Sequence, residues 1–230
     1  MPHLVEPILS PTPVTDVLNA VVEANDCLVS AARQTIARLM SVEAVGWGVA
    51  SKRVKVELPE TRPRLVRHAD RTHAFAEVVN QCATLERLIG ALRWANRELP
   101  DFEVEVCHPT TSSQKQSTGR DNDLILKHAN SGIRYFFEVS DVASSKGDGN
   151  QKEIKDLVSL GVLKSTNRPF TCAPTWPPGR LFLTVSEEFA QYLLRPTRHC
   201  LKAGKFHYSE VGREDTTRII EVIAGPGGSP

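Results

Sequence analysis

The sequence has almost no net charge and no long apolar run. Its 28 Lys and Arg residues nearly balance its 27 Asp and Glu residues, which leaves a formal net charge of +1. Because nucleic-acid binding depends on neutralising phosphates, any such binding here must use a local basic patch. No apolar run approaches the roughly 18 residues of a membrane-spanning helix, and the start of the chain lacks a signal-peptide pattern. We therefore expect no membrane partner.

Cysteine motifs are also absent. The five cysteines are odd in number and widely scattered, with no Cys-x-x-Cys pair: Cys27, Cys82, Cys107, Cys172 and Cys200. This pattern indicates reduced thiols and predicts a cytoplasmic location. Two Cys–His neighbours, Cys107–His108 and His199–Cys200, do not have the usual two-residue spacing of zinc ligands. Buried apolar cysteines and ordinary histidines are the favoured interpretation.

The chain shows no internal repeat and no Gly-x-x-x-x-Gly-Lys phosphate-binding motif. Its apolar content of 40% and charged content of 24% are typical of an ordinary globular protein. A length of 230 residues suits one buried core with an extension, or two small domains. We favour one core with a helical extension.

A long stretch without Pro or Gly follows the Pro-rich residues 1–13. Residues at alternating spacings of four and three form a heptad seam: Val14, Leu18, Val21, Asn25, Leu28, Ala32, Thr35, Leu39 and Val42. The seam predicts a helix over residues 15–44. Neighbouring apolar residues broaden its face, which favours packing within the chain, whereas a polar Asn25 at a seam position is typical of helices that set the register of a dimer. Both interpretations stay open: intramolecular packing, or a homodimer through residues 15–44.

Beyond this helix, periodicity and turn residues predict alternating helices and strands. Helices are expected over 70–98, over 150–163 and from Ser186 onward. Strands are expected over 53–58, 102–107, 124–126, 133–139 and 181–185, with late strands at 206–211 and 218–223 that lie at a sheet edge or form an appended hairpin. Residues 110–119 are expected to form a polar loop.

The centre of the chain carries the most functional information. Asp123 opens a short apolar run, a polar turn follows, and Glu138 lies on the second run, so the pattern predicts a β-hairpin with two carboxylates directed at one place. Alternation places Glu138 and Ser140 on one face of the second strand, with Phe137 on the other. Asn150 and Glu153 match an Asn-x-x-Glu capping pattern at the start of the following helix.

This strand, strand, helix arrangement resembles the PD-(D/E)XK nuclease superfamily over roughly residues 70–195. The resemblance implies an α/β fold: a restriction-endonuclease-like core of a central mixed sheet flanked by helices, here with an N-terminal helical extension. The corresponding division is residues 1–66 as extension and connector, 67–224 as nuclease-like core, and 225–230 as a disordered tail.

The resemblance also implies site residues. Asp123 matches the metal-binding Asp of the family and Glu138 its second carboxylate, and Asp121 is the substitute for Asp123 if the strand register differs by two. Ser140 stands where the family has its Lys. A Lys outside the motif, Lys146 or Lys152, is expected to replace it, and Gln151 resembles a helix Gln found in several members. Glu77 and Glu86 are candidates for an additional helix carboxylate, although a surface charge is favoured for each.

Two functions follow, and neither depends on the whole chain being basic. The first is a nuclease that uses Mg²⁺ or Mn²⁺, held by Asp123 and Glu138, to hydrolyse phosphodiester bonds in nucleic acid, with DNA as the expected partner. The second is a nuclease-like domain that has lost catalysis, because Ser140 replaces the Lys, and that acts as a binding or assembly subunit. An unrelated α/β domain remains a third interpretation.

Overall fold

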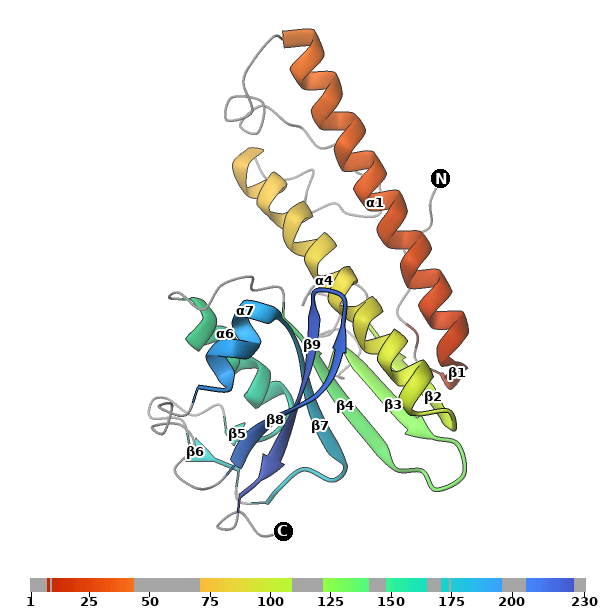
Figure 1. Cartoon of the computed structure of the whole chain (residues 1–230), viewed down its shortest axis with the longest axis vertical. Coiled ribbons are helices and arrows are strands. Elements are labelled where there is room, and N and C mark those ends of the chain that lie inside the picture. The colour runs from red at the N-terminus through yellow and green to blue at the C-terminus, as the bar shows by residue number, and fades with distance from the viewer. Residues whose placement is uncertain are drawn as a thin grey trace.

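The computed structural model describes residues 8, 10–43, 71–108, 122–140, 148–164, 171–173, 175–195 and 206–225. In these ranges the chain forms one seven-stranded mixed sheet, a separate two-stranded sheet and four helices (Figure 1). The elements are β1 (Thr12–Pro13), α1 (Val14–Glu43), α4 (Arg71–Glu98), β2 (Phe102–Cys107), β3 (Leu124–His128), β4 (Arg134–Val139), α6 (Asp148–Ser159), β5 (Leu163–Lys164), β6 (Thr171–Cys172), β7 (Arg180–Ser186), α7 (Glu187–Leu193), β8 (Phe206–Glu214) and β9 (Thr217–Ala224). The α/β class and the mixed sheet are thus confirmed.

The large sheet has the strand order β1-β2-β3-β4-β7-β9-β8. Strands β4 and β7 run parallel, and every other neighbouring pair in this sheet is antiparallel. The predicted hairpin is present, with Leu124 opposite Phe137 and Lys127 opposite Arg134. Strand β4 lies between β3 and β7, in the interior of the sheet.

The two faces of the sheet are covered by different helices. On one face, α1 and α4 pack over Leu124, Phe137 and Phe182. On the other face, Leu157 of α6 and Phe189 of α7 belong to a second apolar cluster. The predicted alternation along β4 is confirmed, because Tyr135, Phe137 and Val139 belong to the α4 side and Phe136 to the α6 side.

The first half of the predicted heptad seam packs within the chain, against α4. Helices α1 and α4 lie side by side (Figure 1), and the seam residues Val14, Val21 and Leu28 are buried in the cluster that also contains α4. Thr15 Oγ1 donates a hydrogen bond to Asn96 Oδ1 of α4 at 3.0 Å. The amide oxygen of Asn25 is buried and has no hydrogen-bond partner among the described residues.

The ends of α6 differ from the prediction. The helix begins at Asp148 rather than at Asn150, so the proposed Asn150 cap is wrong. An acidic residue at the N-terminus complements the helix dipole. The helix ends at Ser159 because Gly161 adopts a positive φ of 75°, with Gly161 N bonded to Val158 O and Val162 N to Leu157 O. This is the Schellman arrangement, which only a glycine adopts without strain.

The predicted helix start at Ser186 is confirmed. Ser186 precedes α7, and its side chain accepts a hydrogen bond from Phe189 N at 3.2 Å. The two late strands form a hairpin within the main sheet, with β9 beside β7 and β8 at the edge. The strand predicted over 53–58, the loop over 110–119 and the residues after Gly225 lie outside the described residues. None of the described helices is long and apolar enough to cross a membrane.

Candidate functional site

The two predicted carboxylates lie opposite each other on neighbouring strands. Leu124 pairs with Phe137, so the same register places Asp123 opposite Glu138. Directly opposite residues on antiparallel strands share a face, with their Cβ atoms roughly 5 Å apart. Both residues are buried, Asp123 with 5% and Glu138 with 1% of its surface exposed. The strand register therefore agrees with the expectation that Asp123 and Glu138 share one face of the sheet.

Each carboxylate is held by a neighbouring polar group. Asp123 Oδ2 accepts a hydrogen bond from the backbone N–H of Val139 at 2.8 Å. Glu138 Oε1 accepts one from the side-chain amide of Asn122 at 3.2 Å. The same amide donates to the carbonyl of Ser159 at 3.2 Å. Because Ser159 is the last residue of α6, its carbonyl lacks a partner within the helix, and Asn122 ties this helix end to Glu138.

Helix α6 brings a lysine to the carboxylates. Lys152 Nζ forms an ion pair with Asp156 Oδ1 at 2.7 Å, one helical turn further along. Burial alone lowers the pKa of Lys152, but the negative charges of Asp156, Asp123 and Glu138 outweigh it and raise the pKa above its ordinary value. Lys152, one of the two lysines that the sequence analysis considered as a replacement, thus contacts Asp156, and the charges of both strand carboxylates help to raise its pKa.

Ser140 does not offer space for a longer side chain. The residue is fully buried, and its N–H donates to Thr184 O at 2.9 Å. Its carbonyl accepts a hydrogen bond from Arg87 Nη1 of α4. A cationic group of α4 thus binds the backbone at Ser140.

His108 extends the row of polar residues across a third strand. Cys107 pairs with Leu124, so His108 lies opposite Asp123, and His108 N donates to Asp123 O at 2.8 Å. His108 is fully buried. Cys107 points to the other face, where it belongs to the apolar cluster of α4, so Cys107 and His108 do not act together as a pair of metal ligands.

The donor chemistry of this site fits a hard divalent cation. Asp123 and Glu138 offer carboxylate oxygens, which Mg²⁺ and Mn²⁺ prefer. Within the described ranges no group of three or more His, Cys, Asp or Glu side chains is arranged to hold a metal ion. Two carboxylates are enough for Mg²⁺, which usually keeps several waters and takes further oxygens from its substrate.

The remaining predicted site residues have different outcomes. Gln151 lies in the first turns of α6, next to Lys152 in the chain. Glu86 is exposed on α4, as the favoured interpretation of a surface charge predicts. Asp121 and Lys146 lie outside the described residues, and so does the side chain of Glu77.

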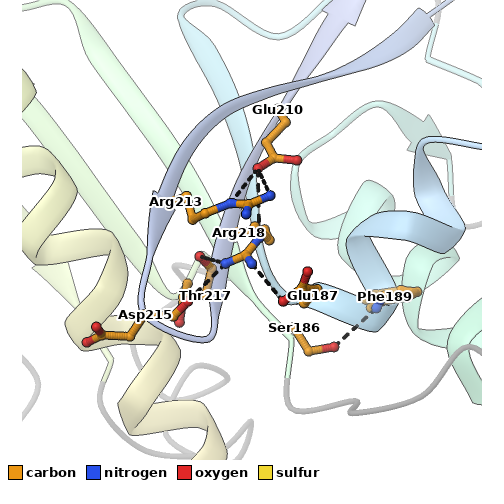
Figure 2. Close-up of polar contacts among 8 residues, drawn as sticks. All are labelled: Ser186, Glu187, Phe189, Glu210, Arg213, Asp215, Thr217 and Arg218. Atoms are coloured by element: carbon orange, nitrogen blue, oxygen red, sulfur yellow. Dashed lines mark hydrogen bonds and ion pairs between the residues drawn. The ribbon is translucent and has the colours of Figure 1, made fainter.

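A second polar cluster lies further along the sheet, where the β8–β9 hairpin meets α7 (Figure 2). Arg218 is buried, and its guanidinium binds Glu187 Oε2 at 2.7 Å and the carbonyls of Asp215 and Thr217 at 3.0 and 3.2 Å. Glu210 lies 3.8 Å from Arg218 Nε. The donors of Arg218 are thus directed at groups of the chain itself, and we interpret this cluster as a cross-link between the hairpin and α7.

Sequence reasoning did not identify four residues around the site: Arg87, Asn122, His108 and Asp156. Arg87 lies within the apolar stripe of α4, and an Arg in such a stripe needs a polar partner, which is a usable signal. Asp156 follows Lys152 at the helical spacing of four, which is also readable. The roles of Asn122 and His108 depend on strand register and on the end of α6, and neither has a local sequence signal.

No protein-family model, no curated protein and no solved structure matches this chain. The function must therefore be inferred from the residues and their geometry.

Proposed function

We propose that the chain is a metal-dependent nuclease that hydrolyses phosphodiester bonds in DNA. The observation that carries the proposal is the placement of the buried carboxylates Asp123 and Glu138 opposite each other on neighbouring strands. Their negative charges also help to raise the pKa of Lys152 on α6. Two carboxylates can bind a divalent ion, and a nearby cation can stabilise the negative charge of a phosphate bound to that ion.

The order of elements supports the same proposal. Helix α4 is followed by three antiparallel strands, β2, β3 and β4, then by α6 on the other face, and then by β7 parallel to β4. The PD-(D/E)XK family is expected to place its Asp and Glu on the second and third of these strands. Asp123, directly before β3, and Glu138 on β4 are compatible with this expectation.

Each residue has a distinct role in this proposal. Asp123 and Glu138 hold the divalent cation, and Asn122 orients Glu138 through its amide. Lys152 supplies the positive charge that the Lys of the motif supplies in the family, and it stabilises negative charge that develops on the phosphate. When bound, the divalent ion contributes charge stabilisation and lowers the pKa of a water.

The test is cleavage of a panel of linear DNA and RNA substrates with Mg²⁺ and with EDTA. We expect Mg²⁺-dependent cleavage of DNA by the natural protein and a loss of about 100-fold or more in Asp123→Asn, Glu138→Gln and Lys152→Met. The matched controls are Asp101→Asn and Glu188→Gln, which change exposed carboxylates. Cleavage that survives in Asp123→Asn and Glu138→Gln would exclude these carboxylates from catalysis.

One observation favours the second candidate, a catalytically degenerate domain that acts as a binding or assembly subunit. Ser140 is fully buried and replaces the Lys of the motif, and Glu138 has only 1% of its surface exposed. In that case natural protein and Glu138→Gln would both be inactive on every substrate. Equal, negligible heats of Mn²⁺ binding in the two proteins would then exclude the metal site.

A further inference from the structure

We propose that Asn122 is a positioning residue that links the end of α6 to the orientation of Glu138, so that divalent-ion binding and the attachment of α6 strengthen each other. This inference rests on the proposed function, because Glu138 is one of the two proposed metal ligands. It adds a conformational consequence to that function: the end of α6 becomes more ordered when the site binds its cation.

The side-chain amide of Asn122 joins two segments that are distant in the chain. Its Nδ2 donates to Glu138 Oε1 and to the carbonyl of Ser159, each at 3.2 Å. A backbone carbonyl only accepts hydrogen bonds, so the NH₂ group of Asn122, and not its oxygen, must face the end of α6. An amide NH₂ group has two N–H bonds, one for each of these acceptors. One planar group therefore holds Glu138 and the end of α6 together.

The end of α6 offers this carbonyl because the chain leaves the helix at Gly161, which has a φ of 75°. The N–H groups of residues 160–162 donate to the carbonyls of residues 156–158. The next carbonyl, that of Ser159, accepts from Asn122 instead. The last carbonyls of a helix need partners from outside it. The attachment of this helix end thus depends in part on the side chain that binds Glu138.

The backbone beside Asn122 is held by strands on both sides. In the next residue, Asp123, the carboxylate accepts from Val139 N of β4 at 2.8 Å, and the carbonyl accepts from His108 N at 2.8 Å. The backbone at Asn122 is therefore fixed relative to the sheet. If the end of α6 moves away from the sheet, the amide of Asn122 loses its contact with the helix.

This arrangement couples the helix to the cation. A divalent ion bound to Glu138 fixes the carboxylate, and a fixed carboxylate keeps the Asn122 amide directed at Ser159. Thermodynamic linkage requires the reverse effect to be equal, so an attached helix end raises the affinity for the ion by the same factor.

A second polar contact attaches α6 to the sheet near the start of the helix. Tyr208 Oη of β8 donates to Glu153 Oε1 at 2.5 Å, and both residues are buried. Strand β8 lies three strands from β4, which corresponds to roughly 14 Å. This contact does not include Glu138. Tyr208→Phe is therefore a matched control, because it weakens the attachment of the same helix at a distance from the candidate site.

The experiment combines Mn²⁺ calorimetry with amide hydrogen exchange of α6 in the presence and absence of Mg²⁺. In the natural protein, saturating Mg²⁺ should slow the exchange of amides 160–162 by about fivefold or more. Asn122→Ala should bind Mn²⁺ about fivefold or more weakly, and its slowing by Mg²⁺ should be about fivefold smaller. Exchange is compared at equal Mg²⁺ occupancy, so that the general stabilisation by a bound ligand is the same in both proteins.

The control variants separate this coupling from a loss of structure. Tyr208→Phe should speed exchange in the first turns of α6, yet change Mn²⁺ affinity by less than about threefold, because it shares no partner with Glu138. Glu138→Gln should abolish the response of α6 to Mg²⁺, since it removes a carboxylate that holds the ion. Faster exchange in Asn122→Ala with unchanged Mn²⁺ affinity would show a merely structural role and overturn the inference.

The remaining outcomes separate this inference from the proposed function. Cation binding by the natural protein without slower exchange at the end of α6 would overturn the coupling and leave the nuclease standing, and this result requires no folded Asn122→Ala. Slower exchange that depends on Asn122, in a protein that cleaves no substrate, would support the coupling and overturn the nuclease. A natural protein that binds neither Mn²⁺ nor Mg²⁺ would overturn both.

Discussion

Cys107 shows how the candidate site changes the properties of a residue on the other face of the sheet. Burial raises the pKa of its thiol, and the negative charge of Asp123 raises it further. A thiol in the unfolded chain has a pKa of about 8.5. Above that pH the unfolded chain loses a proton that the folded chain keeps, so the folded state is progressively less favoured as the pH rises.

This argument gives a prediction for the pH dependence of stability. The contribution of Cys107 is fully present below about pH 8.5, and above it the free energy of unfolding should fall by about 1.4 kcal/mol per pH unit. Replacing the thiol removes its contribution to the pH dependence of the free energy of unfolding. Urea unfolding at pH 8, 9 and 10 should therefore show that the stability difference between natural protein and Cys107→Ala shrinks as the pH rises. Val106→Ala, a buried and non-titrating change on the same strand, should give a difference that does not depend on pH.

Among single residues, the carboxylates were predictable and their supporting groups were not. Asp123 and Glu138 follow from the hairpin pattern, because the side-chain period of a strand fixes which residues share a face. Asn122 donates hydrogen bonds both to Glu138 on β4 and to the Ser159 carbonyl at the end of α6. Contacts of this kind join segments that are distant in the chain, and no local periodicity encodes them.

At the scale of elements, α4 and the β8–β9 hairpin approach each other through two glycines. A Cβ atom on Gly90 would lie 2.7 Å from Thr217 Cβ, and one on Gly212 would lie 2.5 Å from a ring atom of Trp94. Contacts this short require the backbone to move, since neither neighbour is the free end of a flexible chain. The Thr217 side chain of the hairpin therefore packs directly against the backbone of α4 at Gly90, and the Trp94 ring of α4 packs against the backbone of the hairpin at Gly212.

We predict that Gly90→Ala destabilises the protein despite its better helix propensity. Ala is favoured over Gly by about 1 kcal/mol in a helix interior, whereas overpacking in a core costs about 1–3 kcal/mol. A net loss of up to about 2 kcal/mol in the free energy of unfolding is expected, measured by urea denaturation. Glu86→Ala, on the exposed side of the same helix, should change this free energy by less than about 0.5 kcal/mol. A Gly90→Ala variant more stable than the natural protein would contradict the close packing.

The elements themselves were largely predictable, and their ends were less so. The strands β2, β3, β4 and β7 and the helix α4 were expected from apolar periodicity, which extends over many residues. The start of α6 was misplaced because Asn150 and Glu153 match a capping pattern that also occurs inside helices. The predicted end of α6 lies too far along the chain, because the apolar residues Val162 and Leu163 continue the helical pattern. The positive φ of Gly161 ends the helix before them.

At the scale of the whole molecule, the candidate site residues lie together at one end of three neighbouring strands, β2, β3 and β4. Strand β2 ends there at Cys107, just before His108, and β4 ends there at Val139, just before Ser140. Strand β3 begins there at Leu124, just after Asp123. The antiparallel order of these strands makes the end of one adjacent to the start of the next. The sequence predicts these strands and their order along the chain. Which strand ends lie next to each other depends on how the complete sheet is paired.

The protein's assembly state is the second whole-molecule property, and α1 gives the last prediction. The first half of its seam is buried against α4, and its outward positions Asp16, Glu23 and Asp26 are exposed and acidic. A homodimer through residues 15–44 must therefore use the second half of the seam, which continues in the sequence through Leu39 and Val42.

We predict a dimer at tens of micromolar by light scattering, and a monomer for Leu39→Glu with an unchanged circular dichroism spectrum. Glu23→Lys changes an exposed position on the first half of α1, so this variant should stay dimeric. A monomeric natural protein would reject the dimer. A dimer that persists in Leu39→Glu would move the interface away from α1, because a charge at a seam position is incompatible with an apolar helix contact.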